Sequence, residues 1–104
     1  MVINPSNPCG SAFSYKHQME IVKLAEELKV PIFADEVYHG LVYDGEEEYK
    51  SFGTLTKEVP VLCAGSISKT YMVPGWRLGW LIFYNNTGYF DNIMTGLANY
   101  MMIQ

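Results

Sequence analysis

The chain has 104 residues, and its 49% of hydrophobic and 17% of charged residues are typical of a folded globular domain and exclude a disordered one. Its formal net charge of -4 at pH 7 leaves no basic surface of the kind that binds nucleic acid. Two cysteines, Cys9 and Cys63, are too few for a disulfide framework, and their spacing to the two histidines predicts no metal site.

The first elements in chain order are a strand, a loop and a helix. Residues 1–4 are predicted to end a buried strand, and because this strand has no element before it, we expect the chain to be a piece of a longer protein. The following loop, residues 4–10, contains two prolines, which remove amide donors and disfavour regular structure. Ser14 is predicted to cap a helix that runs to about Lys29, since apolar residues recur there near helical spacing.

The rest of the chain alternates strands with loops and ends in a helix. We predict strands within residues 31–34, 60–64 and 76–84, a loop-rich segment at 40–58 and a helix at 87–104. Strand, helix and strand at the start form a βαβ unit, whose strands are parallel. The predicted fold class is therefore α/β, a mostly parallel sheet with flanking helices.

Two packing expectations accompany these elements. Leu41, Val42, Phe52 and Leu55 are predicted to make satellite contacts. The last strand is predicted to be largely buried through Leu78, Trp80, Leu81, Ile82 and Phe83. Because the sequence shows no apolar run of transmembrane length and no signal segment at Met1, we expect a cytoplasmic protein.

Polar residues follow three of the predicted strands at their carboxyl ends, where ligands gather in open α/β sheets because loops there carry polar groups above a rigid base. These residues are Asn7 after the first strand, Asp35 and Tyr38 after the second, and Ser66, Ser68 and Lys69 after the third. Each has a structural explanation when taken singly. Their coincidence at one edge favours a ligand site.

Two ligands are candidates for this edge of the sheet. A nucleotide triphosphate is excluded because the phosphate loop needs glycines six residues and one residue before its lysine, and Cys63 and Ser68 occupy those positions. Pyridoxal phosphate needs a lysine amine for its aldehyde, a carboxylate for its ring nitrogen, and an arginine with hydroxyl donors for its phosphate. The polar set, together with Arg77, supplies each of these groups.

Three motifs carry a resemblance to a known family. They are Asn4-Pro-Ser-Asn-Pro-Cys-Gly10, Ala34-Asp-Glu-Val-Tyr38, and Ser66-Ile-Ser-Lys69 followed by Pro74-Gly-Trp-Arg-Leu-Gly-Trp80. In order and separation they resemble the fold-type I pyridoxal-phosphate aminotransferases of class I/II, and the tyrosine aminotransferase branch in particular. The resemblance implies that residues 1–104 are part of the large, cofactor-binding domain, with the small domain and the N-terminal part absent.

The resemblance also implies roles for four residues around the cofactor ring. Lys69 would form the Schiff base with the aldehyde and then move the proton between substrate and cofactor. Asp35 would pair with the ring nitrogen and keep it protonated. Asn7 and Tyr38 would hydrogen-bond the phenolic oxygen of the ring.

The remaining residues are assigned to the phosphate and to the backbone around it. Ser66, Ser68 and Arg77 would hold the phosphate, for which the planar fork of arginine is well suited. Gly75 and Gly79 are expected to let the backbone pass close to the ligand or the sheet.

The function implied by the resemblance is transfer of an amino group from tyrosine or another aromatic amino acid to a 2-oxo acid, in a protein that is a homodimer at full length. Two alternatives stay open. One is a related pyridoxal-phosphate enzyme, such as a carbon-sulfur lyase or an aminocyclopropane carboxylate synthase. The other is a noncatalytic module that retains part of the fold, and in either case we expect the isolated segment to be inactive as a transaminase.

Overall fold

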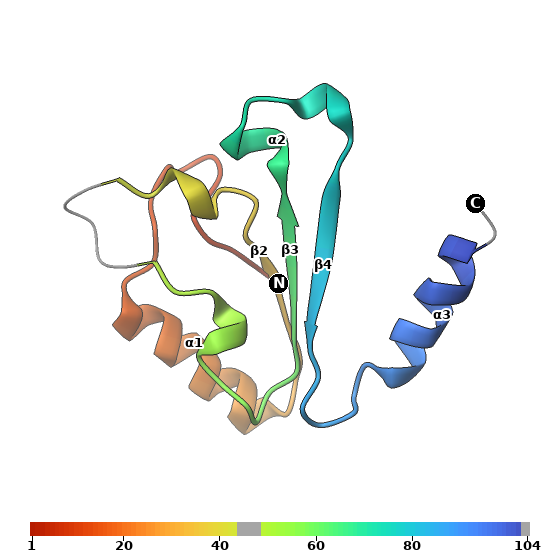
Figure 1. Cartoon of the computed structure of the whole chain (residues 1–104). Helices are drawn as coiled ribbons and strands as arrows, with labels where there is room; N and C mark the ends of the chain where they lie inside the picture. The colour runs from red at the N-terminus through yellow and green to blue at the C-terminus, as the bar shows by residue number, and fades with distance from the viewer. Residues whose placement is uncertain (44–48, 103–104) are drawn as a thin grey trace.

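The computed structural model of the chain describes residues 1–43 and 49–102 and contains one four-stranded sheet (Figure 1). Its strands, in spatial order, are β1 (Val2–Ile3), β2 (Ile32–Asp35), β3 (Val61–Ser66) and β4 (Gly79–Tyr84). β1 and β3 both run parallel to β2, whereas β4 is antiparallel to β3. The predicted α/β fold with a mostly parallel sheet is confirmed.

Three α-helices connect or follow the strands: α1 (Tyr15–Leu28), α2 (Ile67–Thr70) and α3 (Asp91–Met102). Short 3-10 helices lie at His39–Leu41, Phe52–Thr54 and Pro74–Trp76. Within the two described ranges, no helix is both long and apolar enough to cross a membrane.

The boundaries of α1 follow from its end residues. The Ser14 hydroxyl accepts a hydrogen bond of 3.2 Å from the backbone N–H of His17, which satisfies one free amide of the first turn. At the other end Lys29 adopts the left-handed conformation with φ of 53°, and its N–H bonds to carbonyls of the last turn. The predicted helix from Ser14 to about Lys29 is therefore confirmed.

α3 begins later than predicted because a turn precedes it. The Gly88 N–H donates to the Asn85 carbonyl at 3.2 Å, and Gly88 has a positive φ of 74°. The Asn85 side chain then accepts from the Phe90 N–H at 2.9 Å. These bonds keep residues 85–88 out of the helix, which starts at Asp91.

The core lies on the face of the sheet that α1 covers. Its buried residues come from α1, β2, β3 and the segment between them: Val22, Ala25, Ile32, Ala34, Phe52, Val59, Val61 and Cys63. Phe52 is 0% exposed and lies in the centre of this cluster, so the prediction that it makes only satellite contacts is wrong. The physical reason is that the chain before β3 folds back onto the same face as α1, a non-local contact that no sequence period reports.

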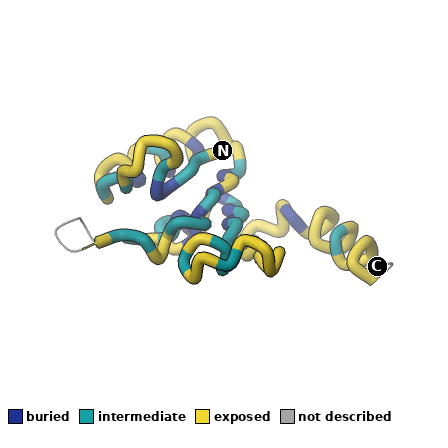
Figure 2. The backbone as a smooth tube through the Cα atoms, turned by 90° about the horizontal axis from the view of Figure 1, so that it is seen from above, coloured by how far each residue is buried: buried dark blue, intermediate teal, exposed yellow. Residues whose placement is uncertain are grey.

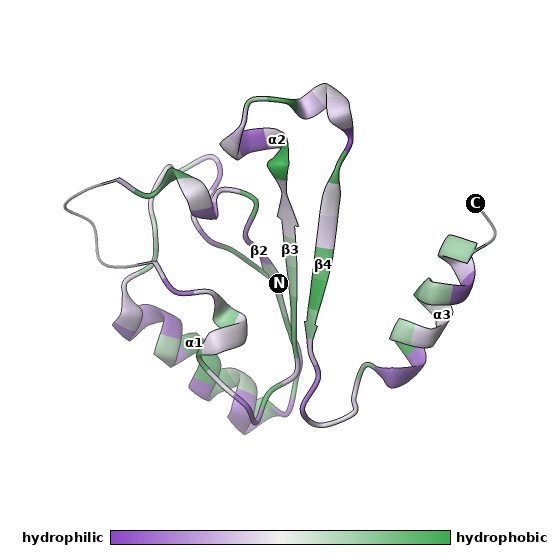
Figure 3. Cartoon of the chain, in the orientation of Figure 1, coloured by the Kyte–Doolittle hydropathy of each residue, from purple (hydrophilic) through white to green (hydrophobic). Residues whose placement is uncertain are grey.

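β4 is exposed on both of its faces, since Trp80 and Ile82 share the α1 face with Cys63 and Leu81 points to the opposite face, and the prediction that it is largely buried is wrong. Leu78, Trp80, Leu81 and Ile82 are 53%, 41%, 46% and 44% exposed. β4 lies at one end of the sheet, and α3 lies beside it (Figure 1). The described chain is accordingly thin, with extents of 44 × 40 × 19 Å, and exposed residues dominate α3 (Figure 2). Hydrophobic residues occur on both elements (Figure 3).

Candidate cofactor-binding site

The loops that follow β1, β2 and β3 leave the sheet at one edge. In the strand register Ile3 lies beside Asp35, and Asp35 lies beside Ala64. Since all three strands are parallel, their carboxyl ends point to the same edge, where β1 and β2 end level with each other and β3 continues two residues further, to Ser66. The structure therefore brings the three predicted sets of polar residues to the same edge.

Tyr38, after β2, contacts one residue from each of the other two segments. The Asn7 side-chain amide donates a hydrogen bond of 3.3 Å to the Tyr38 hydroxyl. The ammonium nitrogen of Lys69 lies 5.7 Å from the centroid of the Tyr38 ring, within the range of a cation–π contact. The amide of Asn7, the phenol of Tyr38 and the amine of Lys69 thus lie close together, although they come from the segments after three different strands.

Asp35 ends β2 on the face of the sheet opposite to α1. Its neighbours Ala34 and Glu36 are buried, and successive side chains of a strand point to opposite faces. One carboxylate oxygen of Asp35 accepts from the Val37 N–H at 3.3 Å. The two consecutive acidic residues therefore point to opposite faces: Glu36 faces the core, and Asp35 is half-buried on the other face at the edge of the sheet.

Ser66 and Ser68 form the start of α2, directly after β3. The Ser66 hydroxyl accepts from the Ser68 N–H at 2.8 Å and so caps the helix. Lys69 follows within this one-turn helix and is exposed. The three residues of this motif are therefore held by a strand on one side and a capped turn on the other.

Arg77 is the one predicted residue whose side chain the structure directs elsewhere. Its guanidinium donates to the Pro74 carbonyl at 2.9 Å, within its own loop. Its backbone is nonetheless close to the start of α2, because Ile67 N–H bonds to the Leu78 carbonyl at 3.4 Å.

The two glycines differ. A Cβ at Gly79 would lie 3.0 Å from the Gly65 carbonyl oxygen, so Gly79 allows a close backbone approach as predicted. A Cβ at Gly75 would meet nothing within 4 Å, so Gly75 makes no close approach to the sheet, and its approach to a ligand stays a prediction.

Asn4 and Glu36 are buried polar residues that the sequence analysis did not assign. Asn4 is 1% exposed and accepts from the Phe13 N–H at 2.8 Å through its side-chain oxygen. Glu36 is 7% exposed and accepts from the Phe52 N–H at 2.9 Å. Both lie inside the motifs, Glu36 next to Asp35 and Asn4 three residues before Asn7, and this position was the signal in the sequence.

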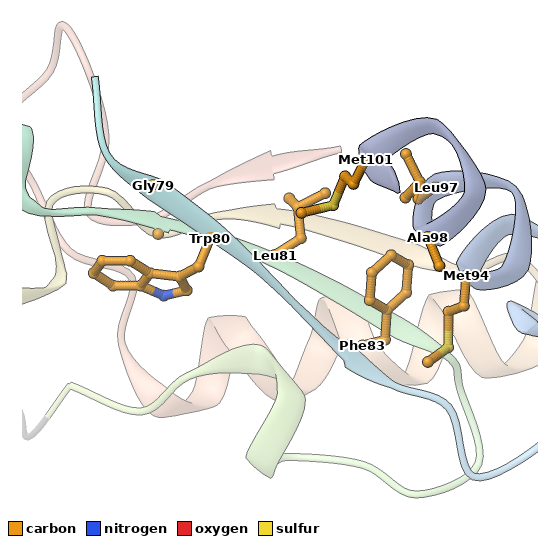
Figure 4. Close-up of a pocket in the computed structure, with 9 residues that line it drawn as sticks. Gly79, Trp80, Leu81, Phe83, Met94, Leu97, Ala98 and Met101 are labelled. Atoms are coloured by element: carbon orange, nitrogen blue, oxygen red, sulfur yellow. The ribbon is translucent and has the colours of Figure 1, made fainter. Parts of the chain in front are cut away.

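A groove away from this edge of the sheet is lined by other residues. It has a volume of about 720 Å³ and lies between β4 and α3 (Figure 4). Its lining is mostly apolar, with Leu81 and Phe83 from the strand and Met94, Leu97 and Met101 from the helix. None of the predicted site residues lines it, so it is not the candidate site.

The residues at the sheet edge fit pyridoxal phosphate by their chemistry. Lys69 offers a primary amine, Asp35 a carboxylate, and Asn7 and Tyr38 hydrogen-bonding groups that already contact each other. The hydroxyls of Ser66 and Ser68 lie at the start of a turn beside the amine. Within residues 1–43 and 49–102, no group of three or more His, Cys, Asp and Glu could hold a metal ion.

Comparisons with known proteins cover almost all of the chain. A family model described as aminotransferase class I and II matches residues 1–102. Tyrosine aminotransferase of Mus musculus is 45% identical over 99 residues, which are 94% of this chain and 22% of that protein. Nicotianamine aminotransferase A of Hordeum vulgare is 41% identical over 105 residues, which cover 99% of this chain and 23% of that protein.

Solved structures agree with this match. An alanine aminotransferase from Pyrococcus furiosus superimposes with a TM-score of 0.89 and 36% identity, over 98% of this chain and 25% of that one. A tyrosine aminotransferase from Leishmania infantum gives a TM-score of 0.81 and 34% identity, over 86% of this chain and 22% of that one. The chain thus spans about a quarter or less of the relatives it matches, and it belongs to the class I and II aminotransferase family.

Proposed function

We propose that the chain is part of a pyridoxal-phosphate aminotransferase that moves an amino group from tyrosine or another aromatic amino acid to a 2-oxo acid. The family depends on pyridoxal phosphate, and its members act on amino acids and 2-oxo acids. The observation that carries the proposal is the meeting of Asn7, Tyr38 and Lys69 at one sheet edge, beside the strand that ends in Asp35.

When bound, the cofactor supplies an aldehyde that condenses with amines and a ring that withdraws electrons from a substrate carbon. Lys69 would hold the aldehyde and, once released, carry a proton to and from that carbon. Lys69 lies on the short capped helix α2, and its amine is 5.7 Å from the centroid of the Tyr38 ring, at the edge of the sheet where the aldehyde would bind. Asp35 would keep a proton on the ring nitrogen through its negative charge.

Asn7 and Tyr38 would bind the phenolic oxygen of the ring. The hydrogen bond between the two side chains holds their polar groups next to each other, so that both can bind the same oxygen atom. Ser66 and Ser68 would bind the phosphate through their hydroxyls. Arg77 would join them after it releases the Pro74 carbonyl.

The choice of an aromatic amino acid is supported by the names of relatives. Proteins named tyrosine aminotransferase from Mus musculus and Homo sapiens are 45% and 44% identical to this chain. We further propose that residues 1–104 belong to the large domain, that the longer protein is a homodimer in the cytoplasm, and that the 104-residue chain alone is inactive as a transaminase.

An absorbance titration tests whether the site binds the cofactor. Pyridoxal 5'-phosphate added to the chain should give a visible band that shifts from that of the free aldehyde, and Lys69→Ala should abolish it. Lys57→Ala is the matched control, because Lys57 is exposed and lies away from the site loops. An equal band in wild type and Lys69→Ala would contradict the proposal and favour a noncatalytic module.

A further inference from the structure

We propose that residues 49–52, named here the strap, are a positioning element that holds the three site loops at the sheet edge in place. The strap is not part of the motifs that identify the family. It lies on the α1 side of the sheet, behind the predicted cofactor site. The link to the cofactor rests on the function proposed above, whereas the contacts of the strap stand on their own.

The two ends of the strap bind the loops that carry Asn7 and Tyr38. At one end the Tyr49 hydroxyl donates to the Asn4 carbonyl at 3.2 Å, just before the loop that contains Asn7. At the other end the Phe52 N–H donates to the Glu36 carboxylate at 2.9 Å. One short segment therefore fixes the chain after both β1 and β2.

The two middle residues of the strap bind α1 and β3. The Lys50 carbonyl accepts from the Gln18 side chain at 2.8 Å. The Ser51 hydroxyl lies 3.6 Å from the Cys63 sulfur, two residues before Gly65 and the Ser66 motif. Four consecutive residues thus contact four different parts of the fold: the chain directly after β1, the chain directly after β2, α1, and the middle of β3.

The contacts of the strap are made largely with buried polar groups. Glu36, Gln18 and Asn4 are 7%, 2% and 1% exposed. A buried polar group that loses its partner pays a desolvation cost, so each favours the one loop conformation that keeps the bond. The strap consequently restricts the conformations of the loops more than the same number of contacts with exposed groups would.

Glu36 connects the strap most directly to the site. Its backbone N–H donates to the Ala64 carbonyl at 2.9 Å, and its own carbonyl accepts from the His39 N–H at 3.0 Å. Glu36 lies between Asp35 and the turn that contains Tyr38, so a side chain anchored on the strap fixes both. Burial and the nearby Glu36 carboxylate raise the pKa of Tyr49, in keeping with the closeness of the two side chains.

Amide hydrogen exchange of the full chain without cofactor tests the strap. Glu36→Ala should raise exchange in residues 36–41 and 49–52, and Tyr49→Phe should raise it in residues 4–10, while α1 stays protected. Glu36→Gln, which keeps an acceptor for the Phe52 N–H, should restore most of the protection. Glu20→Ala, a change of an exposed residue of α1, is the control and should leave the loops as in wild type.

Two exchange results would overturn the inference. One is unchanged exchange in all loops of Glu36→Ala and Tyr49→Phe. The other is a uniform rise that includes α1 in both variants, since this would mean that the contacts contribute only to global stability. A failure of Glu36→Ala to fold leaves Glu36→Gln and Tyr49→Phe to decide between these results.

Cofactor uptake supplies a second readout and separates this inference from the proposed function. With pyridoxal 5'-phosphate, Glu36→Ala should bind about tenfold more weakly than wild type, the scale of one lost hydrogen bond to a charged group, and Glu36→Gln should bind nearly as wild type. Equal affinity of wild type and Glu36→Ala would overturn the strap but not the function. Absence of binding by wild type would overturn the function, and the exchange data would then decide the strap.

Discussion

The side-chain amide of Asn7 donates a hydrogen bond of 3.3 Å to the hydroxyl of Tyr38, although 31 residues separate the two. The contact exists because β1 and β2 are parallel neighbours whose carboxyl ends lie at one edge. Lys69, on the α2 turn that follows β3, lies with its ammonium nitrogen 5.7 Å from the centroid of the same tyrosine ring. The fold thus assembles the candidate site from three loops that are far apart in the sequence.

The burial of Phe52 predicts a large effect on stability. Phe52→Ala should lower the free energy of unfolding by about 3–5 kcal/mol, because it removes a fully buried ring and leaves a cavity in the core. Phe33→Ala should cost clearly less, since Phe33 is 37% exposed on the other face of the sheet. Urea unfolding of both variants measures the difference, and equal losses would mean that Phe52 is not central to the core.

The cap of α1 predicts a smaller effect. Ser14→Ala should lower the free energy of unfolding by about 0.5–2 kcal/mol, because the His17 N–H loses its acceptor at the first turn. Ser11→Ala is the control, since the exposed Ser11 accepts a bond from the Ser6 N–H only through its backbone carbonyl. Urea unfolding should separate the two serines, and indistinguishable midpoints would argue against the cap.

The buried thiol of Cys63 predicts a loss of stability at alkaline pH. Burial raises the pKa of Cys63 above its ordinary value of 9.0. The unfolded chain therefore loses this proton first as the pH rises, and the folded chain binds more protons in the interval. Stability is full below about pH 9 and then falls, by up to about 1.4 kcal/mol for each pH unit until the folded thiol also ionises.

Unfolding curves at pH 7 to 10 in the presence of a reductant check this sign. Cys63→Ala should flatten the decline between about pH 9 and 10, where the thiol of the unfolded chain ionises ahead of most tyrosine hydroxyls. Cys9→Ala should keep the wild-type slope, because Cys9 is exposed. A decline that is identical in both variants would show that another group is responsible.

Local signals in the sequence predicted much of the backbone. The Ser14 cap and the apolar period of the helix defined α1, and the prolines excluded regular structure from residues 4–10. The placement of polar groups at strand ends predicted which residues would meet, because parallel strands end at one edge. Their roles toward a cofactor remain predictions.

Burial was harder to predict because it depends on non-local packing. The apolar run Leu81 to Phe83 is typical of a buried strand, but β4 is the last strand of the described sheet, paired with β3 on one side only, and its residues Leu81 and Ile82 stay exposed. Phe52 sits in a polar, loop-rich segment, yet the chain folds it into the core. The strap has no period or motif, and its contacts reach residues 12 to 45 positions away in the sequence, from Ser51–Cys63 to Tyr49–Asn4.

The most direct measurement is reductive trapping of pyridoxal 5'-phosphate on the chain with borohydride, followed by peptide mapping. We expect one dominant modified peptide, which carries the label on Lys69 and is missing from Lys69→Ala. Asp35→Asn should retain the label at lower yield, because the ring nitrogen loses its charged partner. Label spread evenly over the exposed lysines such as Lys16, Lys23 and Lys57, or no label at all, would contradict a cofactor site at this edge of the sheet.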